Sequence, residues 1–72
     1  MNASPILLQK KYARVVGMFA ELARLPMRDA LGFFYRSRTY DLMSNGISDM
    51  HCRSDGYLAE DLLNEYRESL SS

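Results

Sequence analysis

The chain has 72 residues, of which 47% are apolar and 25% are charged, and it carries no net charge. That length leaves room for one small core, so we expect residues 1–72 to form a single domain. The apolar content excludes disorder over most of the chain, and no apolar run approaches the roughly 20 residues that cross a bilayer.

Cys52 is the only cysteine, so an intramolecular disulfide framework is excluded. The first residues lack the basic start and long apolar core of a signal peptide, because the apolar residues 6–8 run directly into Gln9 and two lysines. Both features lead us to expect a cytoplasmic protein.

The absence of net charge hides a division along the chain. Residues 1–40 carry seven basic and two acidic side chains, a balance of +5, whereas residues 41–72 carry two basic and seven acidic ones, a balance of −5. The simpler interpretation is that the two halves pack together and their charged rims attract each other. The alternative is that the basic half presents a binding face.

A first helix is expected over about residues 5–24, because Ser4 is a favourable N-cap and Pro5 suits the first helical position. Gly17 lowers the helix propensity, so we expect it to mark the close approach of another helix. Six apolar residues recur at helical spacing and predict the face turned to the core. They are Leu8, Tyr12, Val15, Val16, Phe19 and Leu22.

Pro26 should end the first helix and open a second one over residues 27–36, where Asp29 suits the positive helix N-terminus. Its apolar residues also recur at helical spacing. They are Met27, Ala30, Leu31 and Phe34.

Ser37 is a candidate N-cap for a short third helix over residues 38–45, which Asn45 and Gly46 should end. Residues 47–54 show no clear period, and we expect a connection with Ile47 and Met50 pointing inward. Ser54 should cap a last helix over residues 55–69. Its apolar stripe repeats every four residues: Leu58, Leu62, Tyr66 and Leu70.

Strict alternation of apolar and polar residues occurs nowhere, so a sheet is not expected. The sequence predicts an all-α fold, a compact small domain of three to four helices.

We expect no catalytic residue, metal site or cofactor. His51 and Cys52 are adjacent and therefore do not share a face, and they lack the paired ligand spacing of a structural zinc site. The carboxylates of the last helix are interpreted as its solvated edge. They are Glu60, Asp61, Glu65 and Glu68.

Residues 33–40 interleave aromatic residues with arginines, a composition enriched at protein interfaces and nucleic-acid surfaces. Three consecutive aromatic residues at 33–35 cannot all face one core at about 100° per residue. In one interpretation Phe34 and Tyr40 are core and the arginines are merely solvated. In the other the segment forms an interaction surface, with Phe33, Tyr35, Arg36, Arg38 and Tyr40 as its candidate residues.

On the segments Gln9–Tyr12, Phe19–Glu21, Ala30–Tyr35 and above all Gly46–Leu58, the chain resembles a family of short bacterial proteins catalogued as domain of unknown function 3791. The resemblance covers nearly the whole chain but departs at Pro26–Asp29, where members often have a serine and acidic residues. It supplies no activity or catalytic residues. Members are often encoded beside a protein resembling an ADP-ribosyltransferase, which implies a toxin and its neutralising partner.

The leading functional hypothesis is a non-enzymatic protein-interaction module whose partner is another, unidentified protein. One alternative is a helix-turn-helix-like DNA-binding protein, because the first two helices meet at a tight turn and the second opens with Arg28; the zero net charge argues against it. The other alternative is a self-associating module, a homo-oligomer in which the basic half of one copy contacts the acidic half of another. No membrane association is expected.

Overall fold

The computed structural model describes residues 5–45 and 53–71, and every regular element in these ranges is an α-helix. The helices are α1 (Pro5–Ala23), α2 (Met27–Arg36), α3 (Arg38–Ser44) and α4 (Asp55–Ser71). The all-α fold is therefore confirmed, and each helix begins and ends within two residues of its expected bounds. The expectations for Ser4, Gly46, Ile47, Met50, His51 and Cys52 lie outside the described residues.

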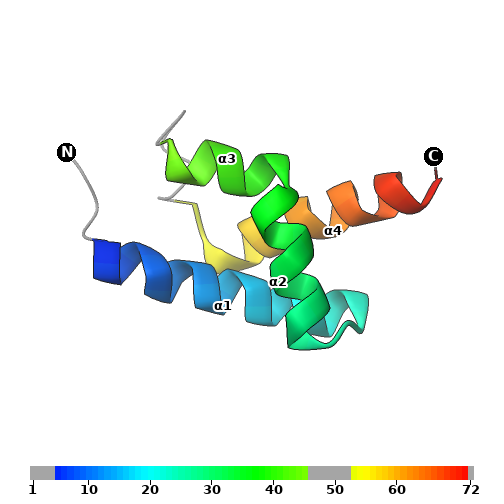
Figure 1. Cartoon of the computed structure of the whole chain (residues 1–72), viewed down its shortest axis with the longest axis horizontal. Coiled ribbons are helices and arrows are strands. Elements are labelled where there is room, and N and C mark those ends of the chain that lie inside the picture. Colours follow the sequence, from blue (N-terminus) through cyan, green and yellow to red (C-terminus); the bar gives the residue numbers. More distant parts are fainter. Residues whose placement is uncertain (1–4, 46–52, 72) are drawn as a thin grey trace.

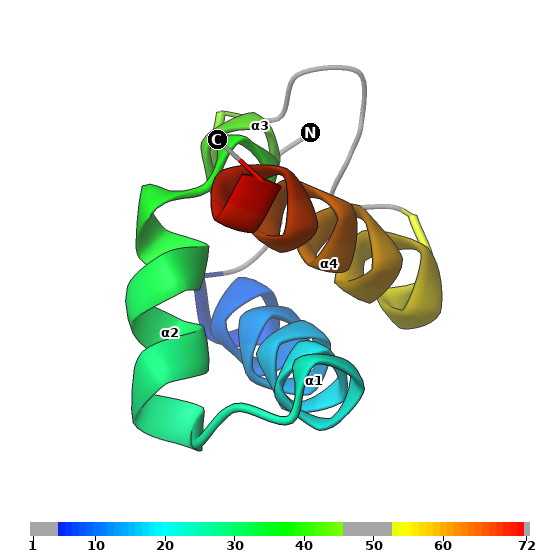
Figure 2. The same cartoon turned by 90° about the vertical axis from the view of Figure 1, so that its right-hand side faces the viewer.

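The helices α1 and α4 lie side by side and run in the same direction, while α2 crosses one side of this pair (Figures 1 and 2). α3 then turns back beside α4, and the molecule measures 37 × 21 × 18 Å. The most extensive packing is between α1 and α4, so the basic first half and the acidic second half are in contact.

One core lies between the four helices. Phe19 of α1, Phe34 of α2 and Leu62 of α4 are completely buried, and each such side chain contributes about 1.5–3 kcal/mol of hydrophobic stabilisation. The other core residues come from all four helices. They are Val15, Val16, Ala20, Ala30, Met43, Leu58 and Ala59.

A left-handed residue joins α1 to α2. Arg24 has φ 58°, its N–H donates to the Glu21 carbonyl, and the Leu25 N–H donates to the Ala20 carbonyl at 2.9 Å. These two hydrogen bonds form a Schellman motif, which satisfies carbonyls at the end of the helix. Pro26 then serves as the N-cap of α2, because its carbonyl accepts the first hydrogen bond of that helix, from Ala30.

Ser37 is the single residue between α2 and α3, and it terminates both helices. Its N–H and its hydroxyl donate to the Phe34 carbonyl, the hydroxyl at 2.6 Å. The hydroxyl oxygen accepts a hydrogen bond from the Tyr40 N–H at 3.0 Å, as expected of an N-cap. Ser54 caps α4 in the same way, accepting from the Tyr57 N–H at 3.1 Å. Both predicted caps are confirmed.

Three residues expected on core faces are exposed: Met27 by 44%, Leu22 by 48% and Leu70 by 67%. Each lies in the first or last turn of its helix, where fewer neighbouring elements cover it; the end of α4 extends past the other helices in Figure 1. The expectation for Gly17 is also wrong, because no atom of another described helix would lie within 4 Å of a Cβ at that position.

Within residues 5–45 and 53–71, no helix combines the length and the apolar character needed to cross a bilayer.

Candidate protein-binding surface

The corner between α2 and α3 carries a connected group of aromatic rings. The ring of Tyr35 lies 5.0 Å from that of Tyr40 and 5.4 Å from that of Phe34, and Phe34 is completely buried. Tyr12 of α1 belongs to the same group: the centroid of its ring lies 5.3 Å from that of Phe34 and 5.5 Å from that of Tyr40. Tyr35 is nevertheless 55% exposed, so it presents a surface while its neighbours fix its position.

Within this cluster, the hydroxyl of Tyr12 has a shifted pKa. Burial is the main cause that raises its pKa above the ordinary value of 10, and the neighbouring hydroxyls of Tyr40 and Tyr35 add to the increase. Tyr12 therefore stays neutral throughout the physiological range and acts as a packing residue.

Two arginines flank the aromatic group. Arg36 and Arg38 are exposed, and neither forms an ion pair with any residue in the described ranges. They line a shallow depression at the corner. Its lining residues are Tyr35, Arg36, Ser37, Arg38, Tyr40 and Asp41. The structure therefore brings together four of the five residues expected at the interaction surface: Tyr35, Arg36, Arg38 and Tyr40.

Phe33, the fifth candidate, lies apart from the other four. Its half-buried ring contacts those of Phe19 and Tyr66, at 5.7 and 5.4 Å between centroids. It lines a second depression, on the side of α2 that faces α4, together with Arg28 and Arg36. Arg36 borders both depressions, so they form adjoining parts of one surface.

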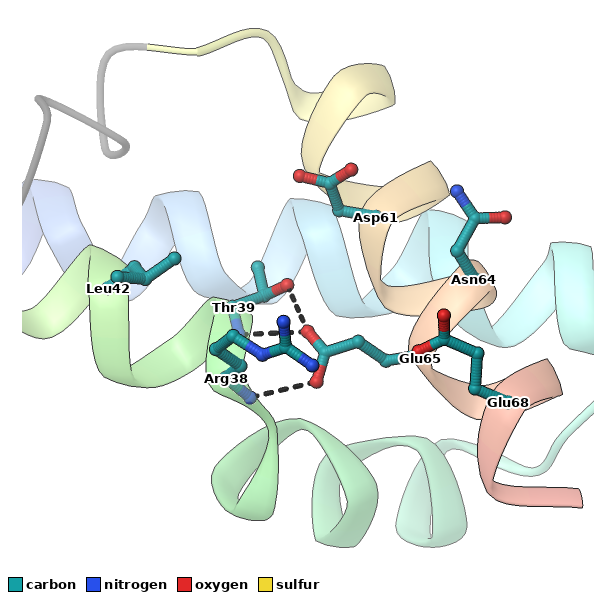
Figure 3. A pocket seen from close by; sticks show the side chains of 7 residues that line it. All are labelled: Arg38, Thr39, Leu42, Asp61, Asn64, Glu65 and Glu68. Atoms are coloured by element: carbon teal, nitrogen blue, oxygen red, sulfur yellow. Dashed lines mark hydrogen bonds between the residues drawn. The ribbon is translucent and has the colours of Figure 1, made fainter. Parts of the chain in front are cut away.

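A carboxylate of α4 holds the corner in place. Glu65 accepts hydrogen bonds from the Arg38 N–H and the Thr39 N–H, each at 2.9 Å, and from the Thr39 hydroxyl (Figure 3). These bonds satisfy donors at the start of α3 that have no partner within that helix. The interpretation of Glu65 as part of a solvated edge is wrong, because Glu65 is seven residues from Leu58 and therefore shares its inward side.

A third depression lies between α3 and α4 and contains several carboxylates (Figure 3). Burial there, and then the neighbouring Glu65, raises the pKa of Asp61, although Arg53 opposes the shift. Among the residues that the structure describes, no three histidine, cysteine or acidic side chains are placed to hold a metal ion. The depression's lining residues are Arg38, Thr39, Leu42, Asp61, Asn64, Glu65 and Glu68.

Two basic residues of α1, Lys11 and Arg14, are used differently from those at the corner. Lys11 and Arg14 contact the two oxygens of Asp55 at 2.7 and 2.8 Å. Hydrogen bonds from Lys11 and Arg14 are the main cause that lowers the pKa of Asp55. At this point the two charged halves attract each other across the packed domain, as the simpler interpretation of the charge division predicted.

No protein-family model, curated protein or solved structure matches the chain. The resemblance to domain of unknown function 3791, and the toxin-neutralising role that it implies, therefore stay predictions.

Proposed function

We propose that the protein is a non-enzymatic interaction module that binds another protein through the α2–α3 corner. The binding surface is the corner patch, which we define as Tyr35, Arg36, Arg38 and Tyr40. Two observations support this most directly. Tyr35 is exposed although its ring packs against Phe34 and Tyr40. The two arginines have no ion-pair partner in the described part of the chain.

Tyrosine and arginine dominate the residues that contribute most to protein-protein binding. Ordering a flexible side chain on binding costs about 0.5–1.5 kcal/mol. Tyr35 avoids much of that cost, because its ring already rests against Phe34 and Tyr40. The corner as a whole is also held rigid by Ser37 and by Glu65.

The nature of the partner is proposed from the resemblance alone. If the chain belongs with domain of unknown function 3791, the partner is a toxin-like protein encoded beside it in a bacterial genome, and both proteins act in the cytoplasm. Co-expression of this chain with the neighbouring toxin-like protein should relieve the growth defect that the toxin-like protein causes. A growth defect that persists would contradict the toxin-neutralising role.

The proposal is tested by affinity capture from cells of the source organism at moderate salt, with nuclease treatment and identification by mass spectrometry. The tagged chain is compared with the double variant Tyr35→Ala, Arg38→Ala. We expect one stoichiometric protein that the wild type captures and the variant loses.

The matched control is the double variant Tyr57→Ala, Lys10→Ala. It removes a tyrosine that is 50% exposed and an exposed basic residue, both away from the corner. Circular dichroism checks that both variants remain folded. Loss of the partner in the control, or its retention after the corner substitutions, would contradict the proposal.

A helix-turn-helix-like DNA-binding function is the second candidate. It is favoured by the tight turn at Arg24 and by the exposed arginines of α2, Arg28 and Arg36. Asp29 lies beside these arginines and Asp41 beside Arg38, and both would repel a continuous polyphosphate. Binding of duplex DNA that weakens steeply with salt would establish this function instead.

A further inference from the structure

The side of α2 that faces α4 carries a second basic feature without an ion-pair partner in the described ranges. Arg28, Gly32 and Arg36 follow one another at intervals of four residues and are all exposed. They border a depression to which Leu25, just before α2, and Tyr66 of α4 also contribute. The two arginines are separated by about 12 Å along the helix axis, and neither forms an ion pair with a residue in the described ranges.

The two arginines border a depression with an apolar floor. Leu25, Phe33 and Tyr66 form that floor, and the volume is about 320 Å³. The rings of Phe33 and Tyr66 meet edge to face at 5.4 Å, so the floor is rigid. This combination can accept an apolar side chain at the centre and an anionic group at either end. We call these residues, together with Arg28, Asp29, Gly32 and Arg36, the α2 groove.

Gly32 lies midway between Arg28 and Arg36, and neither helix propensity nor packing among the described residues favours glycine at this position. Glycine is the least favourable residue after proline in a helix interior. A Cβ at position 32 would meet no atom of another described element within 4 Å, so packing between the described elements does not require glycine there. Because Gly32 lines the groove, a longer side chain at this position would take up part of its space. The glycine therefore leaves the backbone of α2 accessible to close contact with a partner molecule.

We infer that the α2 groove binds an acidic amphipathic helix of the partner protein. This inference rests on the proposed function and specifies the chemistry of the partner. Carboxylates eight residues apart on a helix have the same rise as Arg28 and Arg36, and an apolar residue midway between them would lie over Gly32. Close contact between two helix axes needs a small residue at the crossing point, which Gly32 supplies.

The surrounding charges favour such a helix over a nucleic acid. Asp29 lines the same groove as the two arginines. A polyphosphate presents negative charge continuously and would meet Asp29, whereas a helix with two separated carboxylates need not.

The test uses a fluorescein-labelled, alanine-rich peptide of about 18 residues, long enough to be helical in isolation. It carries two glutamates eight residues apart with leucine midway between them. Fluorescence anisotropy measures its affinity for the whole chain at low and at physiological salt. A matched peptide with glutamine at both positions should bind about tenfold more weakly, because two charge pairs are lost.

Three variants locate the binding site. Gly32→Gln should weaken binding about tenfold while raising the thermal midpoint, since it replaces glycine in a helix by a better helix former. Loss of affinity in this variant therefore cannot be attributed to unfolding. Arg28→Gln combined with Arg36→Gln should give a similar loss and remove the salt dependence. Lys10→Gln, on the exposed side of α1, should change nothing.

Equal affinity for the two peptides, absence of binding, or undiminished binding by Gly32→Gln would overturn the inference. Tighter, Gly32-dependent binding of duplex DNA would reassign the groove to nucleic acid. A concentration-dependent dimer that Gly32→Gln abolishes would assign it to a second copy of this chain. If the captured partner is lost with the Tyr35 and Arg38 variant but kept by Gly32→Gln, this inference fails and the proposed function stands.

Discussion

Lys11 and Arg14 of α1 differ from Arg36 and Arg38 of the α2–α3 corner in the residues that surround them. Lys11 and Arg14 both contact Asp55, and the Lys11 ammonium also donates to the Arg53 carbonyl. Arg36 and Arg38 have no ion pair with the described residues, although Arg38 lines the same depression as carboxylates of α4. The first group joins the two halves of the chain, and the second remains available for a partner. Both segments place basic residues beside a tyrosine, and the difference comes from Asp55 of α4, which contacts the basic residues of α1.

The largest expected effect comes from the residue that holds the corner. Glu65→Ala should lower the free energy of unfolding by about 2 kcal/mol, because the N–H groups of Arg38 and Thr39 lose a charged acceptor. Urea unfolding followed by circular dichroism measures this in a chain that contains no tryptophan. The control is Glu60→Ala, an exposed carboxylate of the same helix, which should cost less than about 0.5 kcal/mol. Equal losses in the two variants would show that Glu65 does not stabilise the corner.

Substitutions of Arg24 distinguish the effect of backbone conformation on stability from the effect of its charge. Because its φ is 58°, Arg24→Gly should raise the free energy of unfolding by about 1 kcal/mol. Arg24→Lys keeps the charge and should leave stability unchanged. If the glycine variant is less stable than the wild type, the left-handed turn after α1 is not the source of strain at this position.

The ion pairs of Asp55 should make stability depend on pH. The folded-state pKa is lowered, so ionised Asp55 stabilises the fold above its unfolded pKa of about 3.9. That contribution is lost as the pH falls through the folded pKa. Asp55→Asn should therefore cost about 0.5–1 kcal/mol at pH 7 and nothing once the wild-type carboxyl is protonated. A loss that is constant over the acidic range would indicate that packing, and not charge, is responsible.

The helices could be predicted because their signals are local. Ser37 and Ser54 cap the helices that follow them, and Pro26 precedes α2, as the sequence indicates. The role of Glu65 was missed because its hydrogen bonds join residues 26 and 27 positions apart. The sequence did contain one signal for this role, because Glu65 is seven residues from Leu58 and therefore lies on the same side of α4.

The candidate surface was predicted only in part. Composition identified the aromatic and basic segment, but it could not separate Phe33 from Tyr35, because their neighbours belong to different helices. Arg28 and Gly32 were not associated with that segment, since only the folded helix shows that they share an open face with Arg36.

The most direct test measures stability and partner binding together in two matched double variants. Arg36→Ala with Arg38→Ala should abolish capture of the partner and change the free energy of unfolding by less than about 0.5 kcal/mol. Lys11→Ala with Arg14→Ala should lower stability by about 1 kcal/mol and leave capture intact. The opposite pattern, with binding lost only in the α1 variant, would contradict the assignment of the α2–α3 corner as the binding surface.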